Sequence, residues 1–345
     1  MHEAAISSAS DCCGEFDAIA ALALGAEKYR WAAPQMGISS GINIEGGRHP
    51  LQELVVPSFV PNDCRLSRAF SEGDGENDRG RRIMLLSGPN QSGKSVYIKQ
   101  TAIIVFLAHI GSFVPAQRAT IGLTDKILTR ISTRESISRV ESAFAIDLMQ
   151  VSRAIRYATP RSLVLVDEFG KGTNVDDGAG AMAALTNHFL ALGSDSPYLL
   201  IATHFHELFD GGHFAQDNNL YFANMAVETD WAANDIEDQV AYTFKLCHGY
   251  NCTSFGTRCA ALNGVPSLVV DRAEAISGLL IRNEDLGSAC TRLSQKEEDQ
   301  LEQAESVARL FLAIEHTESS HRFFADEQGV TSMQEMVRSL FQGER

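Results

Sequence analysis

Gly88-Pro89-Asn90-Gln91-Ser92-Gly93-Lys94-Ser95 is the segment from which the architecture of this chain is predicted. It matches the pattern G-x-x-x-x-G-K-[ST] at every fixed position. An apolar run, Ile83 to Leu86, precedes it, and an apolar-faced segment, Val96 to Ile110, follows it. The pattern is meaningful only in such a strand–loop–helix context. A glycine- and serine-rich turn beside a chance lysine is the alternative, and so complete a pattern disfavours it.

The predicted loop is suited to a nucleoside triphosphate. Glycines let backbone N–H groups close around phosphate oxygens, and the N-terminus of the following helix adds partial positive charge. In this pattern Lys94 reaches the β- and γ-phosphates, and the Ser95 hydroxyl ligates Mg²⁺. All eight residues from Gly88 to Ser95 are therefore candidate nucleotide-binding residues.

Length and composition restrict the possible classes of protein. The 345 residues suggest about two domains of ~150 residues, and 44% hydrophobic with 21% charged residues is typical of a soluble globular protein. The net charge of −15 argues against a chain that is mainly a DNA-binding surface. Seven cysteines without a C-x-x-C pair favour neither zinc nor a disulfide framework. The longest apolar stretch, Thr101 to Pro115, is too short to cross a membrane, so a cytosolic or nuclear compartment is expected.

Helical patterns alternate with short apolar runs along the chain. Leu163 to Val166 and Tyr198 to Ala202 are continuous apolar runs of the kind found in buried parallel strands. Alternation of such strands with helices predicts an α/β domain with a parallel sheet. The other predicted segments are helices over 11–31, 142–157, 178–192 and from 266 onward, a short strand at 42–44, extended segments at 54–56 and 59–60, and a polar loop at 71–80.

Acidic residues follow the first of these buried strands. Asp167 at its end is placed to hold a Mg²⁺ shell, and Glu168 to polarise an attacking water. A kinase with a hydroxyl substrate has less need of such a pair, so hydrolysis is favoured. Thr203-His204 follows the second strand, at the edge of the sheet where open α/β folds bind ligands. His204 is thus a candidate for sensing the γ-phosphate, with a purely structural histidine as the alternative.

These motifs in combination resemble the ATPase domain of the MutS family. The loop reads Gly-Pro-Asn-x-x-Gly-Lys-Ser, and residues 163–174 read Leu-Val-Leu-Val-Asp-Glu-Phe-Gly-Lys-Gly-Thr-Asn. Residues 142–144, Ser-Ala-Phe, are similar to the family's Ser-Thr-Phe segment, and Ala202-Thr203-His204 is also similar. The resemblance covers roughly residues 11–280. The segments most similar to the meiotic branch are 47–51, 59–62, 111–116, 135–138 and 167–174.

The resemblance implies an α/β fold of the ABC-like P-loop NTPase type, with a parallel-rich sheet flanked by helices and a C-terminal helical segment. It implies two ATP·Mg²⁺ sites shared across a dimer. In cis, Glu168, His204, Lys94 and Asn90 would serve catalysis. Asp167 and Ser95 would hold the metal.

Further roles come from the same resemblance. Ser142 would reach the nucleotide of the partner subunit in trans. Phe59 and Asn62 would lie near the adenine, where an aromatic ring can stack on the base. The loop from Gly170 to Thr173 would cross the dimer interface and couple the two sites. Ser254-Phe255-Gly256 resembles the closing segment before the dimerisation helices.

The resemblance also implies a domain layout. Residues 1–46 would be the end of the lever helices and a connecting segment, 47–282 the MutS-type ATPase domain, and 283–345 a helical or partly disordered tail. The recognition, connector and clamp segments of the family are not in this sequence. A fragment, an incomplete gene model or a reduced paralogue would each account for that. Three positions near Ser142 depart from the family pattern: Val140 replaces a glycine, Ala143 a threonine and Asp147 a glutamate.

Two hypotheses follow from the sequence. One is an ATP-hydrolysing domain of a nuclear MutS-homologue DNA clamp, paired with a sister homologue in meiotic recombination or in mismatch-repair-type reactions. The other is a nucleotide-dependent dimerisation module with little or no turnover, which Val140 favours because a Cβ there hinders close approach to a phosphate. An ABC-type ATPase outside the family is disfavoured, since no Leu-Ser-Gly-Gly-Gln-like signature occurs.

Overall fold

A six-stranded sheet organises the first of two units, residues 1–265, into which the chain divides; the second unit is residues 266–345. The structure is a computed structural model. It describes residues 2–38, 41–67, 81–131, 143–205, 207–210, 213–214, 219–229, 240–251 and 255–282, together with 286, 299 and 302. The predicted loop at 71–80, Ser142 with Val140, and nearly all of the predicted tail at 283–345 lie outside these residues.

The strand order of this sheet is β10-β9-β4-β8-β7-β6. All neighbours pair in parallel except β9 and β10, which are antiparallel. Every side chain of β4, β7 and β8 is buried, as their continuous apolar sequences predict. The predicted α/β class with a parallel-rich sheet is thereby confirmed. The strands are β4 (Ile83–Ser87), β6 (Ile127–Arg130), β7 (Leu163–Asp167), β8 (Tyr198–Ala202), β9 (Leu220–Thr229) and β10 (Val240–His248).

A smaller sheet of four strands has the order β1-β5-β2-β3. Strand β2 pairs antiparallel with both β3 and β5, while β1 pairs in parallel with β5. The sequence predicted only the start of β2. Its strands are β1 (Gln35–Gly37), β2 (Ile42–Gly47), β3 (Asn62–Leu66) and β5 (Arg118–Gly122).

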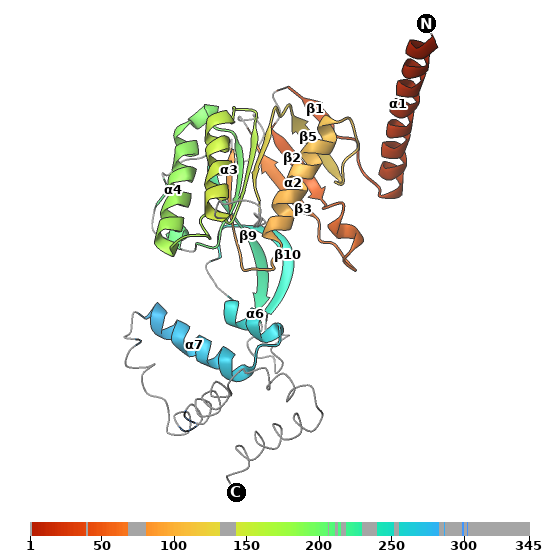
Figure 1. The fold of residues 1–345 in the computed structure, drawn as a ribbon. Helices are drawn as coiled ribbons and strands as arrows, with labels where there is room; N and C mark the ends of the chain where they lie inside the picture. Colours follow the sequence, from red (N-terminus) through yellow and green to blue (C-terminus); the bar gives the residue numbers. More distant parts are fainter. Residues whose placement is uncertain are drawn as a thin grey trace, which may run out of the picture. The chain divides into compact units, whose positions relative to one another are not determined.

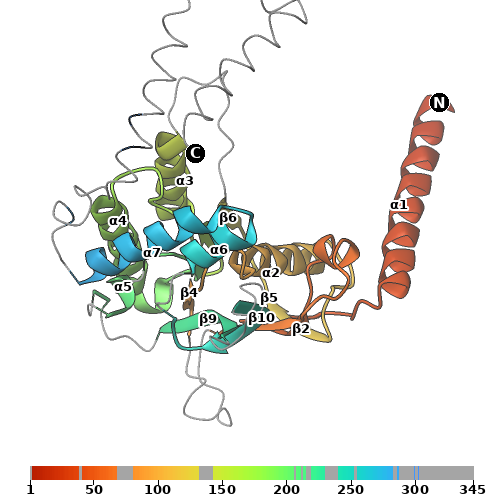
Figure 2. The same cartoon turned by 90° about the horizontal axis from the view of Figure 1, so that it is seen from below.

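Helices cover both faces of the six-stranded sheet. Helix α2 lies on one side, and α3 and α4 lie on the other (Figures 1 and 2). Helix α1 is exposed along most of its length and has Ala26 as its buried residue near the C-terminal end. The described helices are α1 (His2–Lys28), α2 (Lys94–His109), α3 (Ala143–Tyr157), α4 (Val175–Ala191), α5 (Glu207–Asp210) and α6 (Gly256–Leu262), with α7 (Ser267–Ile281) in the second unit.

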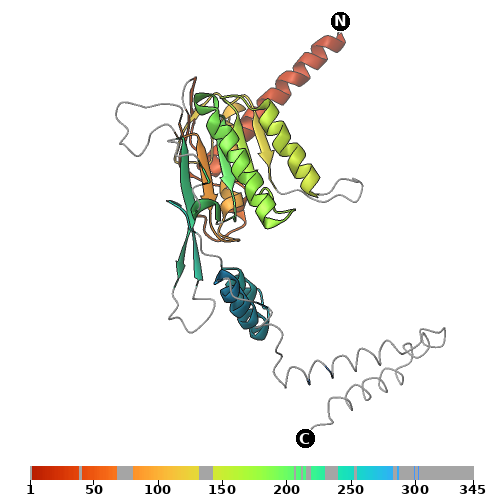
Figure 3. The ribbon, with the colours of Figure 1, turned by 90° about the vertical axis from the view of Figure 1, so that its left-hand side faces the viewer.

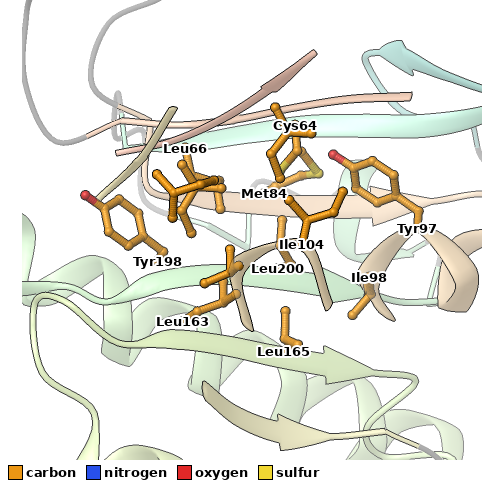
Figure 4. Packing of buried hydrophobic residues seen from close by; sticks show 14 of the residues in the cluster. Cys64, Leu66, Met84, Tyr97, Ile98, Ile104, Leu163, Leu165, Tyr198 and Leu200 are labelled. Atoms are coloured by element: carbon orange, nitrogen blue, oxygen red, sulfur yellow. The ribbon is translucent and has the colours of Figure 1, made fainter. Parts of the chain in front are cut away.

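Two hydrophobic cores lie on opposite faces of the six-stranded sheet. Alternate residues of β4 show the division, because Met84 belongs to one core and Leu85 to the other. The first core joins the sheet to α2 and to the smaller sheet, and Figure 4 shows part of it, including Leu66, Ile104 and Leu200. The second core joins the sheet to α3, α4 and α5. Both faces of the sheet are thus covered. The loops that follow the strands lie at the ends of the strands.

The predicted extended segment at 54–56 is wrong, whereas residues 59–60 form neither a helix nor a paired strand. Residues Gln52–Leu54 form a 3₁₀ turn, η1, and the Val55 N–H donates to the Gln52 carbonyl at 3.0 Å. The side chain of Val55 is 79% exposed. Local turn bonds therefore satisfy this backbone, and Pro57 with Pro61 limits strand pairing because proline donates no hydrogen bond to a ladder. A second 3₁₀ turn, η2, spans Gly193–Asp195.

Strands β9 and β10 form a ribbon that extends past the ends of the neighbouring strands (Figures 1 and 3). Its register shifts between Tyr242 and Leu246, which marks a bulge. Asn62 at the start of β3 joins the ribbon at this bulge. Its amide donates to the Phe244 carbonyl at 2.8 Å, and its oxygen accepts from the Leu246 N–H at 2.7 Å. In the described part of the chain, no helix is long and apolar enough to span a bilayer.

Candidate functional site

Three parallel strands bring the predicted site residues to one edge of the sheet. Strand β8 pairs with β4 on one side and with β7 on the other. The glycine-rich loop at 88–95 follows β4, Thr203-His204 follows β8, and Glu168 follows β7, which ends at Asp167. His204 therefore lies on the strand end between the loop and the acidic pair. The carboxyl ends of such strands are where open α/β folds bind ligands.

The loop at 88–95 has the backbone of an anion cradle. Gly88, Gln91 and Gly93 have φ values of 137°, 67° and 100°. A Cβ on Gly88 would lie 3.1 Å from the Ser92 hydroxyl oxygen, so the loop is closely packed there. Helix α2 begins at Lys94 with Gly93 as its N-cap and without a side-chain cap. Its first N–H groups remain available to an anion.

Lys94 folds over this loop. Its buried ammonium donates to the carbonyls of Gly88 at 2.6 Å and of Pro89 at 2.9 Å. Burial lowers the pKa of Lys94, and the nearby carboxylates of Glu168 and Asp167 act in the opposite direction. The charge is thus already removed from bulk water at the centre of the loop. An arriving phosphate would attract it more strongly than two neutral carbonyls do.

Asp167 carries the observation that bears on a metal. Its Oδ1 is buried and has no hydrogen-bond partner among the described residues. Burial raises the pKa of this carboxyl, a hydrogen bond from the Ser95 hydroxyl lowers it, and the charge of Glu168 raises it further. A buried carboxylate oxygen beside a hydroxyl is a donor set that fits Mg²⁺, which prefers oxygen ligands.

The residues around Asp167 also fit the usual manner of Mg²⁺ binding. No group of three or more His, Cys, Asp or Glu side chains that could hold a metal occurs in the part that the structure describes. Mg²⁺ usually takes one or two protein ligands and completes its shell with phosphates and water. Asp167 and Ser95 therefore fit a metal that arrives with a nucleotide.

Glu168 is held in an unusual conformation. Its φ is 53°, a region that residues other than glycine rarely adopt, and its N–H donates to the Ala202 carbonyl at 2.9 Å. Its Oε2 pairs with the Lys171 ammonium at 2.9 Å. Burial alone would raise the pKa of Glu168, but Lys171, helped by Lys94 and His204, lowers it. The carboxylate therefore stays ionised as a hydrogen-bond acceptor.

The remaining predicted residues lie around this group. The Thr203 N–H donates to the Leu86 carbonyl at 3.0 Å, which ties the end of β8 to β4. The His204 ring packs on Phe205 with 4.3 Å between centroids, and His204 is close enough to influence the pKa of Glu168. Asn90 is exposed at the tip of the loop. The structure thus gathers Asn90, His204 and the acidic pair at one edge, while Ser142 lies outside the described residues.

An apolar pocket of about 400 Å³ adjoins the glycine-rich loop. Phe59 lines it together with Gln91 of the loop, Tyr97 of α2 and Phe244 of β10. The family resemblance implies that Phe59 lies near the adenine, and that role stays a prediction. Asn62 also lines the pocket, but both polar atoms of its amide bond to the β10 backbone. Asn62 therefore builds the wall of the pocket.

Sequence reasoning missed three residues that shape the site. Lys171 pairs with Glu168, and Phe244 forms part of the pocket. Arg130 at the end of β6 donates to the Asp167 carbonyl and forms a buried ion pair with Asp147. A basic residue shortly after the apolar pair Ile127-Leu128 was the available signal, whereas nothing in the sequence pointed to the partners of Arg130.

Comparison with known proteins identifies the family of this chain. Residues 84–280 match the family described as MutS domain V. The chain belongs to the MutS family. It is 33% identical over 312 residues to MutS protein homolog 5 of Saccharomyces cerevisiae, covering 87% of this chain and 34% of that protein. It is 35% identical over 278 residues to the DNA mismatch repair protein MutS of Rhodopirellula baltica, covering 80% and 29%.

A third relative is also a mismatch repair protein. The DNA mismatch repair protein MutS 2 of Halobacterium salinarum is 38% identical over 262 residues, covering 75% of this chain and 28% of that protein. The chain spans about a third of the length of these curated relatives. The predicted resemblance to the MutS family is confirmed, and MutS protein homolog 5 is among the relatives that match.

Proposed function

We propose that this chain binds and hydrolyses ATP with Mg²⁺ at the edge formed by β4, β8 and β7. The observation that carries the proposal is the unpartnered buried oxygen of Asp167 beside Ser95 and the glycine-rich loop. In this reading the domain is a P-loop NTPase of the ABC-like type. Membership of the MutS family supports it, because relatives of this chain include DNA mismatch repair proteins.

Nucleotide binding would divide between the loop and the apolar pocket. Backbone N–H groups from Gly88 to Ser95 and the start of α2 would receive the phosphates, and Lys94 would exchange its carbonyl partners for phosphate oxygens. The base would enter the pocket beside Phe59, whose ring can stack on it. Asp167 and Ser95 would hold Mg²⁺, which neutralises phosphate charge when bound.

Hydrolysis would rest on Glu168. An ionised carboxylate accepts a hydrogen bond from water. This bond orients a lone pair of the water oxygen toward the phosphate. Because Lys171 lowers the pKa of Glu168, this residue is a weak base, and positioning the water is its larger contribution. His204 and Asn90 would contact the γ-phosphate or the attacking water from the neighbouring strand end and from the loop.

We propose that this domain, as part of a longer protein of the family, belongs to a nuclear MutS-homologue DNA clamp. By the resemblance to the meiotic branch, it would pair with a sister homologue and act in crossover recombination or in mismatch-repair-type reactions. ATP-dependent dimerisation would bring Ser142 to the nucleotide of the partner. DNA would be bound by the complete protein.

The alternative is a nucleotide-dependent dimerisation module with little or no turnover. The ion pair between Glu168 and Lys171 favours it, because a carboxylate engaged with an ammonium is less available to water. Lys171 is 58% exposed, so this exposed pair is weak and a bound nucleotide can replace it.

Turnover of Glu168→Gln separates the two functions. Steady-state ATP hydrolysis is measured for the wild type and the variant, alone and with a candidate partner. The variant is expected to keep the affinity for ATP and to lose about 100-fold or more of kcat. ATP binding without Glu168-dependent turnover in any combination would establish the dimerisation module instead. Absence of Mg²⁺-dependent ATP binding would contradict both proposed functions.

A further inference from the structure

Arg130 connects three elements beneath the site. It is the last residue of β6, and its side chain is buried. One guanidinium nitrogen donates to the backbone carbonyl of Asp167 at the end of β7. The other forms an ion pair with Asp147, which is also buried and lies in the first half of α3. A planar guanidinium fixes both partners in one geometry.

The peptide between Asp167 and Glu168 is consequently held from both sides. Its carbonyl accepts from Arg130, and its N–H donates to the Ala202 carbonyl at 2.9 Å. This peptide leads directly into the left-handed backbone of Glu168, whose φ is 53°. Such a conformation persists only where the surroundings over-determine it. Arg130 supplies one of the two hydrogen bonds that do so.

We propose that Arg130 is a positioning residue for Glu168, and that Asp147 holds Arg130 in place from α3. The inference rests on the proposed hydrolysis at Glu168. Arg130 does not touch the nucleotide in this scheme. It fixes the backbone from which the Glu168 carboxylate projects, and it makes the placement of that carboxylate depend on the position of α3.

The placement of Glu168 depends on α3 because Arg130 bonds to Asp147 and to the Asp167 carbonyl at the same time. The ion pair is buried, so water cannot replace either partner at low cost. A shift of α3 would move Asp147, and Arg130 would have to leave either Asp147 or the Asp167 carbonyl. Misplacement of a reacting group by about 1 Å lowers rates by about 100-fold. The expected effect of losing Arg130 is therefore on kcat.

The test uses the double variant Arg130→Met/Asp147→Leu in the full chain. Removing only one partner leaves a buried charge that can unfold the protein, whereas apolar residues of similar volume commonly preserve stability. Arg156→Met is the matched control, because Arg156 lies on the same helix and is exposed. Hydrolysis is measured together with binding of a fluorescent ATP analogue in Mg²⁺.

The double variant is expected to lose about tenfold or more of kcat, with KM and analogue Kd changed less than about twofold. Arg156→Met should match the wild type. In a Glu168→Gln background the double substitution should have little further effect, because residues that act through one another are not additive. A general structural defect would instead lower kcat equally in both backgrounds, and that result would overturn the inference.

Hydrogen exchange tests the positioning without turnover. The Glu168 amide is expected to exchange at least about tenfold faster in the double variant than in Arg156→Met. Unchanged exchange with unchanged kcat would refute the role of Arg130 while leaving the proposed ATPase intact. If the wild-type protein shows no hydrolysis that depends on Glu168, the ATPase is refuted, and with it the positioning role of Arg130.

Discussion

The pKa values of two consecutive carboxyls in this site shift in opposite directions. Burial raises the pKa of Asp167, while the Lys171 ammonium outweighs burial at Glu168 and lowers the pKa there. Local partners explain the difference, since Lys171 pairs with Glu168, whereas Oδ1 of Asp167 is buried without a hydrogen-bond partner among the described residues. Pairs of titratable groups with diverging pKa values are typical of sites where each has a separate task.

The raised pKa of Asp167 predicts a pH dependence for Mg²⁺-dependent nucleotide binding. As the pH falls, Asp167 takes up a proton at a higher pH than an ordinary aspartate, and the neutral carboxyl no longer ligates the metal. Affinity for a fluorescent ATP analogue should therefore fall on the acid side. More Mg²⁺ should move the midpoint to lower pH, because metal and proton compete.

Titrations at several Mg²⁺ concentrations check this prediction. Asp167→Asn is the control, and its binding should show no such Mg²⁺-dependent midpoint. A wild-type midpoint that does not move with Mg²⁺ would contradict the assignment of Asp167 as the metal ligand.

At the scale of elements, close backbone contact joins the loop after β7 to helix α4. Gly170 has a φ of 92°, and a Cβ on Gly178 would lie 2.5 Å from the Gly170 carbonyl oxygen. The same Cβ would lie 2.9 Å from the Phe205 ring. The loop that carries Lys171 thus lies against α4, and Phe205, the residue after His204, also approaches α4 at Gly178.

Gly178→Ala is expected to lower the free energy of unfolding by about 1–3 kcal/mol, because overpacking displaces this contact. Gly180→Ala in the same helix is the control, since a Cβ there meets nothing within 4 Å. Alanine at that position should stabilise the protein by up to about 1 kcal/mol through helix propensity. Urea unfolding of both variants measures the difference. Equal stabilities would show that the contact does not restrict the loop.

At the scale of the whole molecule, charge opposes an independent association with DNA. The chain has a net charge of −15 and spans about a third of the length of its relatives. Binding to phosphate backbones depends on clustered basic side chains and on counterion release. The acidic balance therefore predicts weak DNA binding by this chain alone.

The chain alone is expected to bind random-sequence duplex DNA with a Kd weaker than about 1 μM at physiological salt, and more weakly as salt rises. Fluorescence anisotropy at increasing salt, with and without ATP and Mg²⁺, measures this. Tight binding that persists at physiological salt would contradict the prediction and reveal a basic surface that the net charge conceals.

The amino-acid sequence alone determined the features that depend on residues close together along the chain. The glycine-rich loop, the buried strands β4, β7 and β8, and the acidic pair Asp167-Glu168 are local patterns, so they could be recognised without a structure. The confirmed family membership came from the same motifs. Strands with mixed burial, such as β3 and β6, carry weaker local signals and were not predicted.

Only the tertiary structure decided which distant residues meet. Asn62 bonds to Phe244 across 182 residues, and Arg130 reaches Asp167 across 37. No periodicity encodes such pairs, because they arise when strands from remote parts of the chain become neighbours in a sheet. The same long-range packing buried the Asp167 oxygen and brought His204 between the loop and the acidic pair. The residues of the site were therefore readable from sequence, whereas their partners and pKa values depended on the fold.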